Sequence, residues 1–288
     1  MINDLIIIGS GPAGLSAALY TCRAKLKTIV IGKDNGALEK AELIENYFGL
    51  EKPLSGLELI QNGKKQVLNL GGTIFEEEVI GISWNKYFEI ETTQRKLQTK
   101  AVLIATGASR KKVNLENLEK FEGKGVSYCA VCDAFFYRNK DVAVLGNGAY
   151  ALKELEELLP IAKSVTLLTN GLEPMVEIPK EINIIKTSIH KLSGENILES
   201  IKFTDNTEIF VNGLFIALGN ASASDLAKKL GAVLTPQGLI KVNENMETNI
   251  KGLFAAGDCT GGLLQVSKAI GEGAKASQKI IQYVRNFK

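Results

Sequence analysis

The chain has 288 residues, which is enough for two domains of ordinary size. A hydrophobic content of 45%, a charged content of 23% and a net charge of +2 are typical of a globular protein and do not point to nucleic acid. No apolar run reaches the roughly 18 residues that a membrane-spanning helix needs, and the first apolar run lacks the basic segment of a secretion signal. With four cysteines, two of them a close pair, we expect a cytoplasmic redox protein with no membrane partner.

A phosphate-binding turn is predicted near the start of the chain. Residues 5–8 form a continuous apolar run, typical of a strand buried on both faces. Gly9, Gly11 and Gly14 follow and open a helix-forming run. The first glycine permits a tight turn, the second lets the backbone approach a pyrophosphate, and the third allows close packing of helix on strand. A further strand is expected at residues 28–31, which places the motif in a βαβ unit.

The segment after this unit is less informative. Asp34 lies about 20 residues after the last motif glycine, and it is either a ribose ligand or a solvated acid in a turn. Residues 45–49 are typical of a loop, and residues 56–70 fit an amphipathic helix. Residues 74–99 predict a short β-meander, in which the single tryptophan, Trp84, is expected to lie in the core.

A second buried strand is predicted within residues 101–109. It ends in small residues, among them Thr106 and Gly107, which either let a cofactor approach the backbone or form a packing turn. The polar and charged segment 111–125 that follows is expected to be a linker into an inserted module.

A pair of cysteines with an adjacent acid comes next, at Cys129, Cys132 and Asp133. Two thiols at this spacing can form and break a disulfide, the pKa of one of them is typically lowered, and the acid can move a proton. A zinc site needs about four nitrogen or sulfur ligands, and the remaining cysteines and the one histidine lie far off in sequence. We therefore expect no metal, and an inert buried pair is the other alternative.

A second strand–turn–helix unit follows the cysteine pair. A strand at residues 141–145 runs into Gly146 and Gly148 in a Gly-x-Gly-x-x-Ala pattern. A helix is expected at residues 151–159 and another strand at residues 164–168. The pattern predicts a second dinucleotide-binding fold.

The glycine pattern of that second unit does not specify which nucleotide, if any, it binds. An NAD site needs an acid at the end of the second strand and an NADP site needs arginines, yet residues 169–172 read Thr-Asn-Gly-Leu. Tyr150 also places a large ring where a small residue would leave room for a nucleotide. One interpretation is therefore that this second, Rossmann-like unit no longer binds a nucleotide.

The remaining elements complete the two sheets. Strands are expected at residues 182–186, 200–204, 208–211 and 214–218, and a short helix at residues 225–230. Residues 252–258 predict a strand that ends on Asp258, and residues 265–283 a helix. Asp258 is placed either to accept a hydrogen bond from a sugar-alcohol hydroxyl or to cap the helix.

Together these stretches resemble the low-molecular-weight bacterial thioredoxin reductases over essentially the whole chain. The resemblance is carried by residues 9–14, 105–109, 129–133 and 252–258 with Gln265, and the Cys-Ala-x-Cys-Asp pentapeptide is its most specific part. It implies an α/β fold of two Rossmann-like, three-layer ββα domains, the second inserted in the first. It also implies a homodimer.

The resemblance further implies where the domains and the cofactor lie. Residues 1–112 and 243–288 would form a discontinuous FAD-binding domain, and residues 113–242 a pyridine-nucleotide-domain-like insert that carries the redox disulfide. The implied FAD site comprises Gly9, Gly11, Pro12, Ala13, Gly14, Asp34, Asn46, Ala105, Thr106, Gly107, Gly257, Asp258, Gln265 and Val266.

The same resemblance implies roles for the catalytic residues. Cys132 would face the flavin, Cys129 would attack the disulfide of thioredoxin, and Asp133 would donate the proton. Because one disulfide would serve both a buried flavin and a bulky partner, we expect a rotation between the domains, with hinges near residues 110–115 and 238–243.

The departures from the family pattern fall on the nucleotide motifs. The family's Asn/Asp-Ser/Thr and Glu pair appear as Ala149, Tyr150, Lys153 and Glu154, its arginine clamp as Thr169, Asn170, Gly171 and Met175, and its Gly-His-x-Pro-Asn loop as residues 219–223. This selective loss is similar to the clostridial ferredoxin-dependent flavin thioredoxin reductases and implies ferredoxin as the electron donor. An NADPH- or NADH-dependent thioredoxin reductase is the first alternative, and a flavin-bearing redox sensor without turnover is the second.

Overall fold

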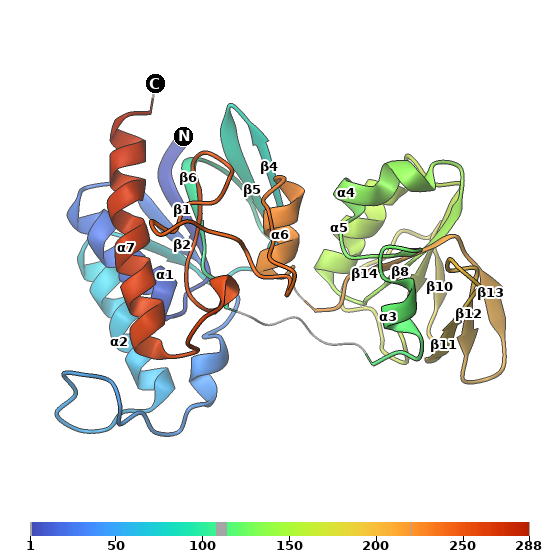
Figure 1. Ribbon diagram of the computed structural model, residues 1–288, viewed down its shortest axis with the longest axis horizontal. Helices are drawn as coiled ribbons and strands as arrows, with labels where there is room; N and C mark the ends of the chain where they lie inside the picture. The colour runs from blue at the N-terminus through green and yellow to red at the C-terminus, as the bar shows by residue number, and fades with distance from the viewer. Residues whose placement is uncertain (1, 108–113, 220, 288) are drawn as a thin grey trace. The chain divides into compact units, whose positions relative to one another are not determined.

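The chain folds into two compact units, described here from a computed structural model that covers residues 2–107, 114–219 and 221–287 (Figure 1). The first unit comprises Met1–Ser109 and Ser222–Lys288, and the second comprises Arg110–Ala221. Each unit holds a mainly parallel sheet, further antiparallel strands and helices. The predicted α/β class, with one Rossmann-like domain inserted in another, is confirmed.

A seven-stranded sheet forms the centre of the first unit, in the order β3-β2-β1-β6-β5-β4 with β15 also paired to β6. The parallel strands are β1 (Ile2–Ile8), β2 (Thr28–Ile31), β3 (Thr73–Phe75), β6 (Lys96–Ile104) and β15 (Leu253–Ala255). The strands β4 (Val79–Asn85) and β5 (Tyr87–Thr92) add an antiparallel hairpin beside β6. Because β1, β6 and β15 run parallel, the segments that follow them meet at one edge of the sheet.

Three helices lie together against the parallel strands (Figure 1): α1 (Pro12–Arg23), α2 (Gly56–Asn69) and α7 (Val266–Arg285). Helices α1 and α7 approach closely at Gly273, where a Cβ atom would lie 2.1 Å from the carbonyl oxygen of Ala13. The absence of a side chain at Gly273 permits this approach. The unit also contains α6 (Ala223–Lys229) and the short 3-10 helices η1 (Ala37–Lys40) and η3 (Asp258–Thr260). None of the helices in the described ranges is long and apolar enough to cross a membrane.

The second unit combines a five-stranded sheet with a three-stranded antiparallel one. The larger sheet has the order β10-β9-β8-β14-β7, formed by Asn183–Ile185, Ser164–Leu168, Asp141–Leu145, Gly213–Ile216 and Val126–Ser127. The smaller sheet contains β11 (Ile189–Ser193), β12 (Ser200–Phe203) and β13 (Glu208–Phe210). The helices are α3 (Leu118–Phe121), α4 (Ala130–Asp133), η2 (Ala134–Tyr137) and α5 (Ala149–Leu158).

Several sequence predictions need correction in the first unit. Residues 74–84 are not one strand of a meander, because β3 pairs parallel with β2 and is separate from β4. Trp84 does not lie in the core and is 62% exposed. It lies two residues before Lys86, which turns the β4–β5 hairpin with a positive φ of 64°, and the strand has by then run past the core.

The boundaries between the units also differ from the expected ones. Residues 115–121, expected within a linker, contribute Leu115, Leu118 and Phe121 to the core of the second unit. The chain returns to the first unit at Ser222 and not near residue 243. Ile240 is 1% exposed and donates its backbone N–H to Cys259 at 2.9 Å, so residues 238–243 belong to the first unit and are not a hinge.

The buried position of Phe121 gives a direct test of the corrected boundary. Phe121→Ala is expected to destabilise the second unit by about 3–5 kcal/mol, because it leaves a cavity in the core. Phe210, on β13, is 76% exposed, and Phe210→Ala is expected to cost less than about 0.5 kcal/mol. Urea unfolding followed by circular dichroism compares the two variants, and equal midpoints would show that residues 115–121 are a linker after all.

Candidate active site

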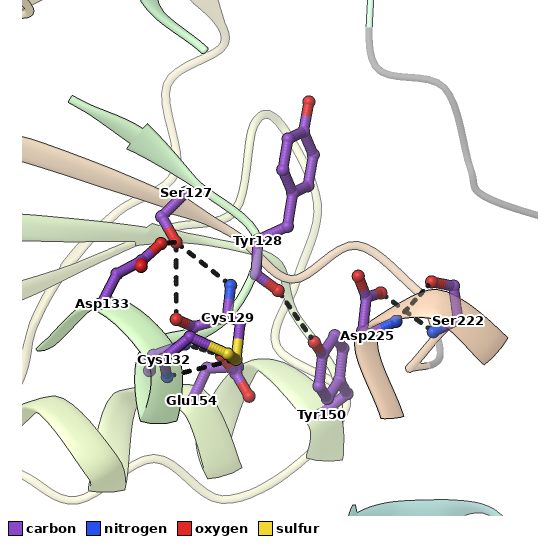
Figure 2. Close-up of a disulfide and its surroundings, with 10 residues drawn as sticks. Ser127, Tyr128, Cys129, Cys132, Asp133, Tyr150, Glu154, Ser222 and Asp225 are labelled. Atoms are coloured by element: carbon purple, nitrogen blue, oxygen red, sulfur yellow. Dashed lines mark hydrogen bonds between the residues drawn. A yellow bond between two sulfur atoms is a disulfide. The ribbon is translucent and has the colours of Figure 1, made fainter. Parts of the chain in front are cut away.

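A disulfide joins Cys129 and Cys132 in the second unit (Figure 2). Cys129 is the N-cap residue of α4, and its sulfur accepts the backbone N–H of Cys132 at 3.2 Å. Cys129 is 2% exposed, whereas Cys132 is exposed to solvent. The two sulfurs therefore differ: the first is buried at the N-cap of a four-residue helix, and the second is accessible.

Ser127 connects the disulfide to the adjacent acid. Its hydroxyl donates to Asp133 Oδ2 at 2.6 Å and accepts the backbone N–H of Cys129 at 3.1 Å (Figure 2). Burial, and after it the negative charge of Asp133, raises the pKa of the neighbouring Tyr137. The carboxylate is thus held one hydroxyl away from the backbone of Cys129, in a position suited to a group that moves a proton.

Helix α5 packs against the redox segment, residues 127–133. Glu154 is 1% exposed, and its Oε2 accepts the backbone N–H of Ala130 at 2.6 Å. One helical turn earlier, Tyr150 is equally buried and donates its hydroxyl to the carbonyl oxygen of Tyr128 at 3.4 Å (Figure 2). The inward face of α5 therefore fixes the backbone on both sides of Cys129.

Sequence reasoning missed Ser127 and Glu154 as parts of this site. For Glu154 the available signal was its spacing of four residues from Tyr150, which places both side chains on one face of a helix. No sequence pattern identifies Ser127.

The second glycine turn is bonded to the loop that follows β9. The carbonyl oxygen of Asn147 accepts the backbone N–H of Met175 at 2.7 Å, and its side-chain amide donates to the carbonyl oxygen of Glu173 at 2.9 Å. Glu173 forms an ion pair with Lys186 at 2.6 Å. The loop is therefore bonded to the turn at Asn147, and it offers an acid paired with a lysine and no arginine.

The first glycine turn lies at the edge where β1, β6 and β15 end. Gly9 has a φ of +116°, and a Cβ atom there would lie 2.2 Å from the carbonyl oxygen of Ala105. A Cβ atom at Gly14 would lie 2.0 Å from the carbonyl oxygen of Gly9, whereas one at Gly11 would meet nothing within 4 Å. Gly9 and Gly14 thus have the local roles that the sequence predicts, and Gly11 leaves open space.

This edge fits a bound group that carries phosphates. No side chain caps the N-terminus of α1, so its first backbone N–H groups are directed at the open space beside Gly11. The hydroxyl of Thr106 is buried and has no hydrogen-bond partner among the described residues. A buried hydroxyl needs a partner, and a polar ligand would supply it.

The loop after β15 is held by an ion pair on α7. Glu272 accepts the backbone N–H of Gly257 at 2.8 Å and pairs with Lys268 at 2.9 Å. Lys268 donates to the carbonyl oxygens of Gly257 and Gly261. This network fixes the loop that contains Asp258, and it was not foreseen from the sequence.

The other expected cofactor residues are partly brought together. The Asn46 amide donates to Gln265 Oε1 at 3.3 Å, and Val266 begins α7 next to it. Asp34 is exposed and its carboxylate accepts the backbone N–H of Gly36 at 2.8 Å, so its observed contact is that of a turn acid. Residues 108 and 109 of the expected strand end lie outside the described residues.

Comparisons with known proteins agree with this arrangement. The family model described as pyridine nucleotide-disulphide oxidoreductase matches residues 3–273. A thioredoxin reductase of Ureaplasma parvum serovar 3 is 35% identical over 98% of this chain and 97% of its own length. The chain belongs to this family, as a low-molecular-weight thioredoxin reductase.

Solved structures of thioredoxin reductases share its fold. The atypical thioredoxin reductase TRi from Desulfovibrio vulgaris Hildenborough is 38% identical, with a TM-score of 0.92 and 98% of both chains covered. A ferredoxin-flavin thioredoxin reductase from Clostridium acetobutylicum is 33% identical, with a TM-score of 0.71 and 97% of both chains covered. Thioredoxin reductases of this family bind FAD, as the sequence predicts, and the edge beside Gly11 and Thr106 fits the phosphates and polar atoms of that cofactor.

The unpartnered Thr106 hydroxyl gives a test of the cofactor site. Thr106→Val is expected to weaken FAD binding about three- to tenfold, because the cofactor loses one hydrogen bond. The stability of the apoprotein should not fall, since the hydroxyl has no partner among the described residues. Thr169 in the second unit is also buried with an unpartnered hydroxyl, so Thr169→Val is the matched control. Equal FAD dissociation constants for the two variants would contradict the assignment.

The two other cysteines are expected to be inert. Burial raises the pKa of Cys259 to about 12, and burial raises that of Cys22 as well. At pH 8 both of these thiols stay protonated, so brief alkylation of the reduced, folded protein should modify the exposed Cys132 and leave Cys22 and Cys259 unmodified. Mass spectrometry of the alkylated peptides checks this, and rapid labelling of Cys259 without unfolding would contradict it.

Proposed function

We propose that this thioredoxin reductase takes its electrons from reduced ferredoxin and not from NADPH or NADH. The observation that carries the proposal is the state of the second glycine turn, where Tyr150 is buried and the loop at residues 173–175 is bonded to Asn147. A nucleotide bound in the usual way would lie beside this loop, which supplies neither the acid that an NAD site uses at the strand end nor the arginines of an NADP site.

The other two departures also have local roles that do not involve a nucleotide. Asn170 stands in the expected arginine clamp and has a positive φ of 51°, and its side chain accepts the backbone N–H of Ile189 at 2.7 Å. In the altered loop at residues 219–223, Ser222 caps α6 by accepting the backbone N–H of Asp225 at 3.2 Å. Asn220 of this loop lies outside the described residues.

The comparisons support the same donor in one respect. The Clostridium acetobutylicum protein is named a ferredoxin-flavin thioredoxin reductase, and it is 33% identical over 97% of both chains. Other relatives are named simply thioredoxin reductase. These names do not distinguish the donors, whereas the residues at the second glycine turn favour ferredoxin.

The roles proposed for the two sulfurs are those that the resemblance to the family implies. FAD, when bound, would supply two electrons, and with two protons the disulfide would open to two thiols. Cys129 attacks the disulfide of thioredoxin as the thiolate, and Cys132 then attacks the mixed disulfide, which restores the Cys129–Cys132 bond and releases thioredoxin as a dithiol. Asp133, oriented by Ser127, holds the proton that this exchange moves.

Domain movement is part of the proposal, because Cys129 is 2% exposed and thioredoxin is large. We therefore propose a rotation of the unit Arg110–Ala221 against the unit of Met1–Ser109 with Ser222–Lys288. The expected division therefore changes to an FAD-binding unit of Met1–Ser109 with Ser222–Lys288 and an insert of Arg110–Ala221.

The proposed FAD site keeps the residues expected from the resemblance. The first glycine turn would hold the pyrophosphate and Asp258 the ribitol, while Asn46, Gln265 and Val266 would lie along the flavin. Asp34 and the strand end at residues 105–107 complete the set. We further propose a homodimer and a cytoplasmic location, which suits an enzyme that keeps thioredoxin reduced.

A donor experiment tests the proposal directly. The oxidised, FAD-loaded protein is mixed anaerobically with excess NADPH, with NADH, and with chemically reduced ferredoxin, and the flavin absorbance is followed. We expect rapid bleaching with ferredoxin and none with either nucleotide. Rapid bleaching by a nucleotide would restore an NADPH- or NADH-dependent thioredoxin reductase.

Replacement of the thiols tests the assigned roles. Cys129→Ser is expected to abolish thioredoxin reduction while reduction of the flavin by ferredoxin continues, and Cys22→Ser serves as a control that retains both activities. Thioredoxin reduction is measured by insulin precipitation. Retained activity in Cys129→Ser would show that the thiol roles are wrong, and a wild-type protein that never reduces thioredoxin would favour a redox sensor without turnover.

A further inference from the structure

A buried carboxylate lies beside the redox disulfide and has no part in the chemistry described above. Glu154 is 1% exposed, and it accepts the backbone N–H of Ala130, the first residue of α4 and the neighbour of Cys129. Figure 2 shows its side chain reaching from α5 toward the two sulfurs. Glutamate is rarely this deeply buried, so its position calls for an explanation.

Nucleotide binding does not explain the position of Glu154. Its neighbours on the same helix, Ala149, Tyr150 and Lys153, differ from the family pattern, and Glu154 alone is kept. Its side chain is buried against the redox segment and bonded to it. A role toward the disulfide therefore fits its contacts better.

The charges around α4 show what that role is. The titratable groups that α4 and the packed elements η2 and α5 bring to this side are Asp133, Tyr137, Tyr150 and Glu154. Of the cations on these elements and next to them, Lys153 pairs with Glu157 at 3.6 Å and Arg138 stacks over the ring of Phe135. Among the described residues, the titratable groups that α4, η2 and α5 bring to this side are therefore mainly acids and phenols.

An acidic environment affects the two redox states differently. A helix N-terminus stabilises a thiolate, and the stabilised thiolate makes a disulfide a stronger oxidant. A carboxylate bonded to the first N–H group of the same helix opposes that effect, because it places a negative charge where the thiolate would form. The disulfide, which is uncharged, is not disfavoured in this way.

We propose that Glu154 is a positioning residue that keeps the Cys129–Cys132 pair strongly reducing. Reduction adds two electrons and two protons to the disulfide and yields two thiols, and Glu154 acts only by disfavouring the thiolate of Cys129. The inference rests on the proposed function in one respect, namely that the pair must deliver electrons to the disulfide of thioredoxin.

The experiment measures the equilibrium of the disulfide with a dithiothreitol buffer at pH 7 in the FAD-loaded protein. Glu154→Gln keeps an oxygen that accepts the Ala130 N–H and removes the charge. Its reduced-to-oxidised ratio is expected to rise about tenfold, which corresponds to a potential about 30 mV less negative. Glu156 lies on the same helix and is exposed, so Glu156→Gln is the matched control and should stay within about twofold of the wild type.

An unchanged or lower ratio in folded Glu154→Gln would overturn the inference. If this variant does not fold, a pH titration of the reduced wild type, followed by thiolate absorbance at 240 nm, tests the proposal instead. The Cys129 pKa is expected at or above about 8.5, and a value below about 7 would overturn the proposal. The measurement uses neither ferredoxin nor thioredoxin. A shifted ratio in a protein that fails to reduce thioredoxin would therefore reject the proposed function and leave the role of Glu154 intact.

Discussion

The two hydrogen bonds from α5 to the redox segment are the interactions on which the second unit depends. Tyr150 bonds to the backbone before Cys129, and Glu154 bonds to the backbone after it. In a dinucleotide-binding fold the first turn of this helix serves the phosphates of a nucleotide. Here its buried face supports the segment that holds a disulfide.

The two glycine turns of the chain show this change by comparison with each other. Beside Gly11 there is open space, an uncapped helix N-terminus and a buried hydroxyl on Thr106 that lacks a partner among the described residues. At the second turn, Asn147 is bonded to the loop that carries Glu173. The second turn shares the open space, beside Gly148, the uncapped helix N-terminus and a buried hydroxyl without a described partner, on Thr169. The loop bonded to Asn147 is therefore what distinguishes the two turns.

Much of the fold was predictable, because strands buried on both faces are continuous apolar runs. The strands at residues 28–31, 141–145 and 164–168 have the predicted bounds. The predictions failed where an apolar residue has a tertiary context that its neighbours do not reveal. Trp84 lies beyond the core at a hairpin tip, and Phe121 is buried within a segment whose charged composition is typical of a linker.

The candidate site was predictable to the extent that its residues form motifs. The Cys-x-x-Cys pair and the first glycine turn can be recognised from the spacing of their residues. Ser127 and Glu154 act through contacts that only the folded chain creates. Asp34 shows the opposite case, in which correct spacing from the glycines led to a residue whose observed contact is a local turn.

The central claim is that the second unit no longer seats a pyridine nucleotide. Calorimetric titration of the oxidised, FAD-loaded protein with NADPH and with NADH tests it most directly, without any need for the natural donor. The account predicts dissociation constants of about 1 mM or weaker for both nucleotides, which corresponds to about 4 kcal/mol of binding free energy. A dissociation constant in the micromolar range for either nucleotide would contradict it.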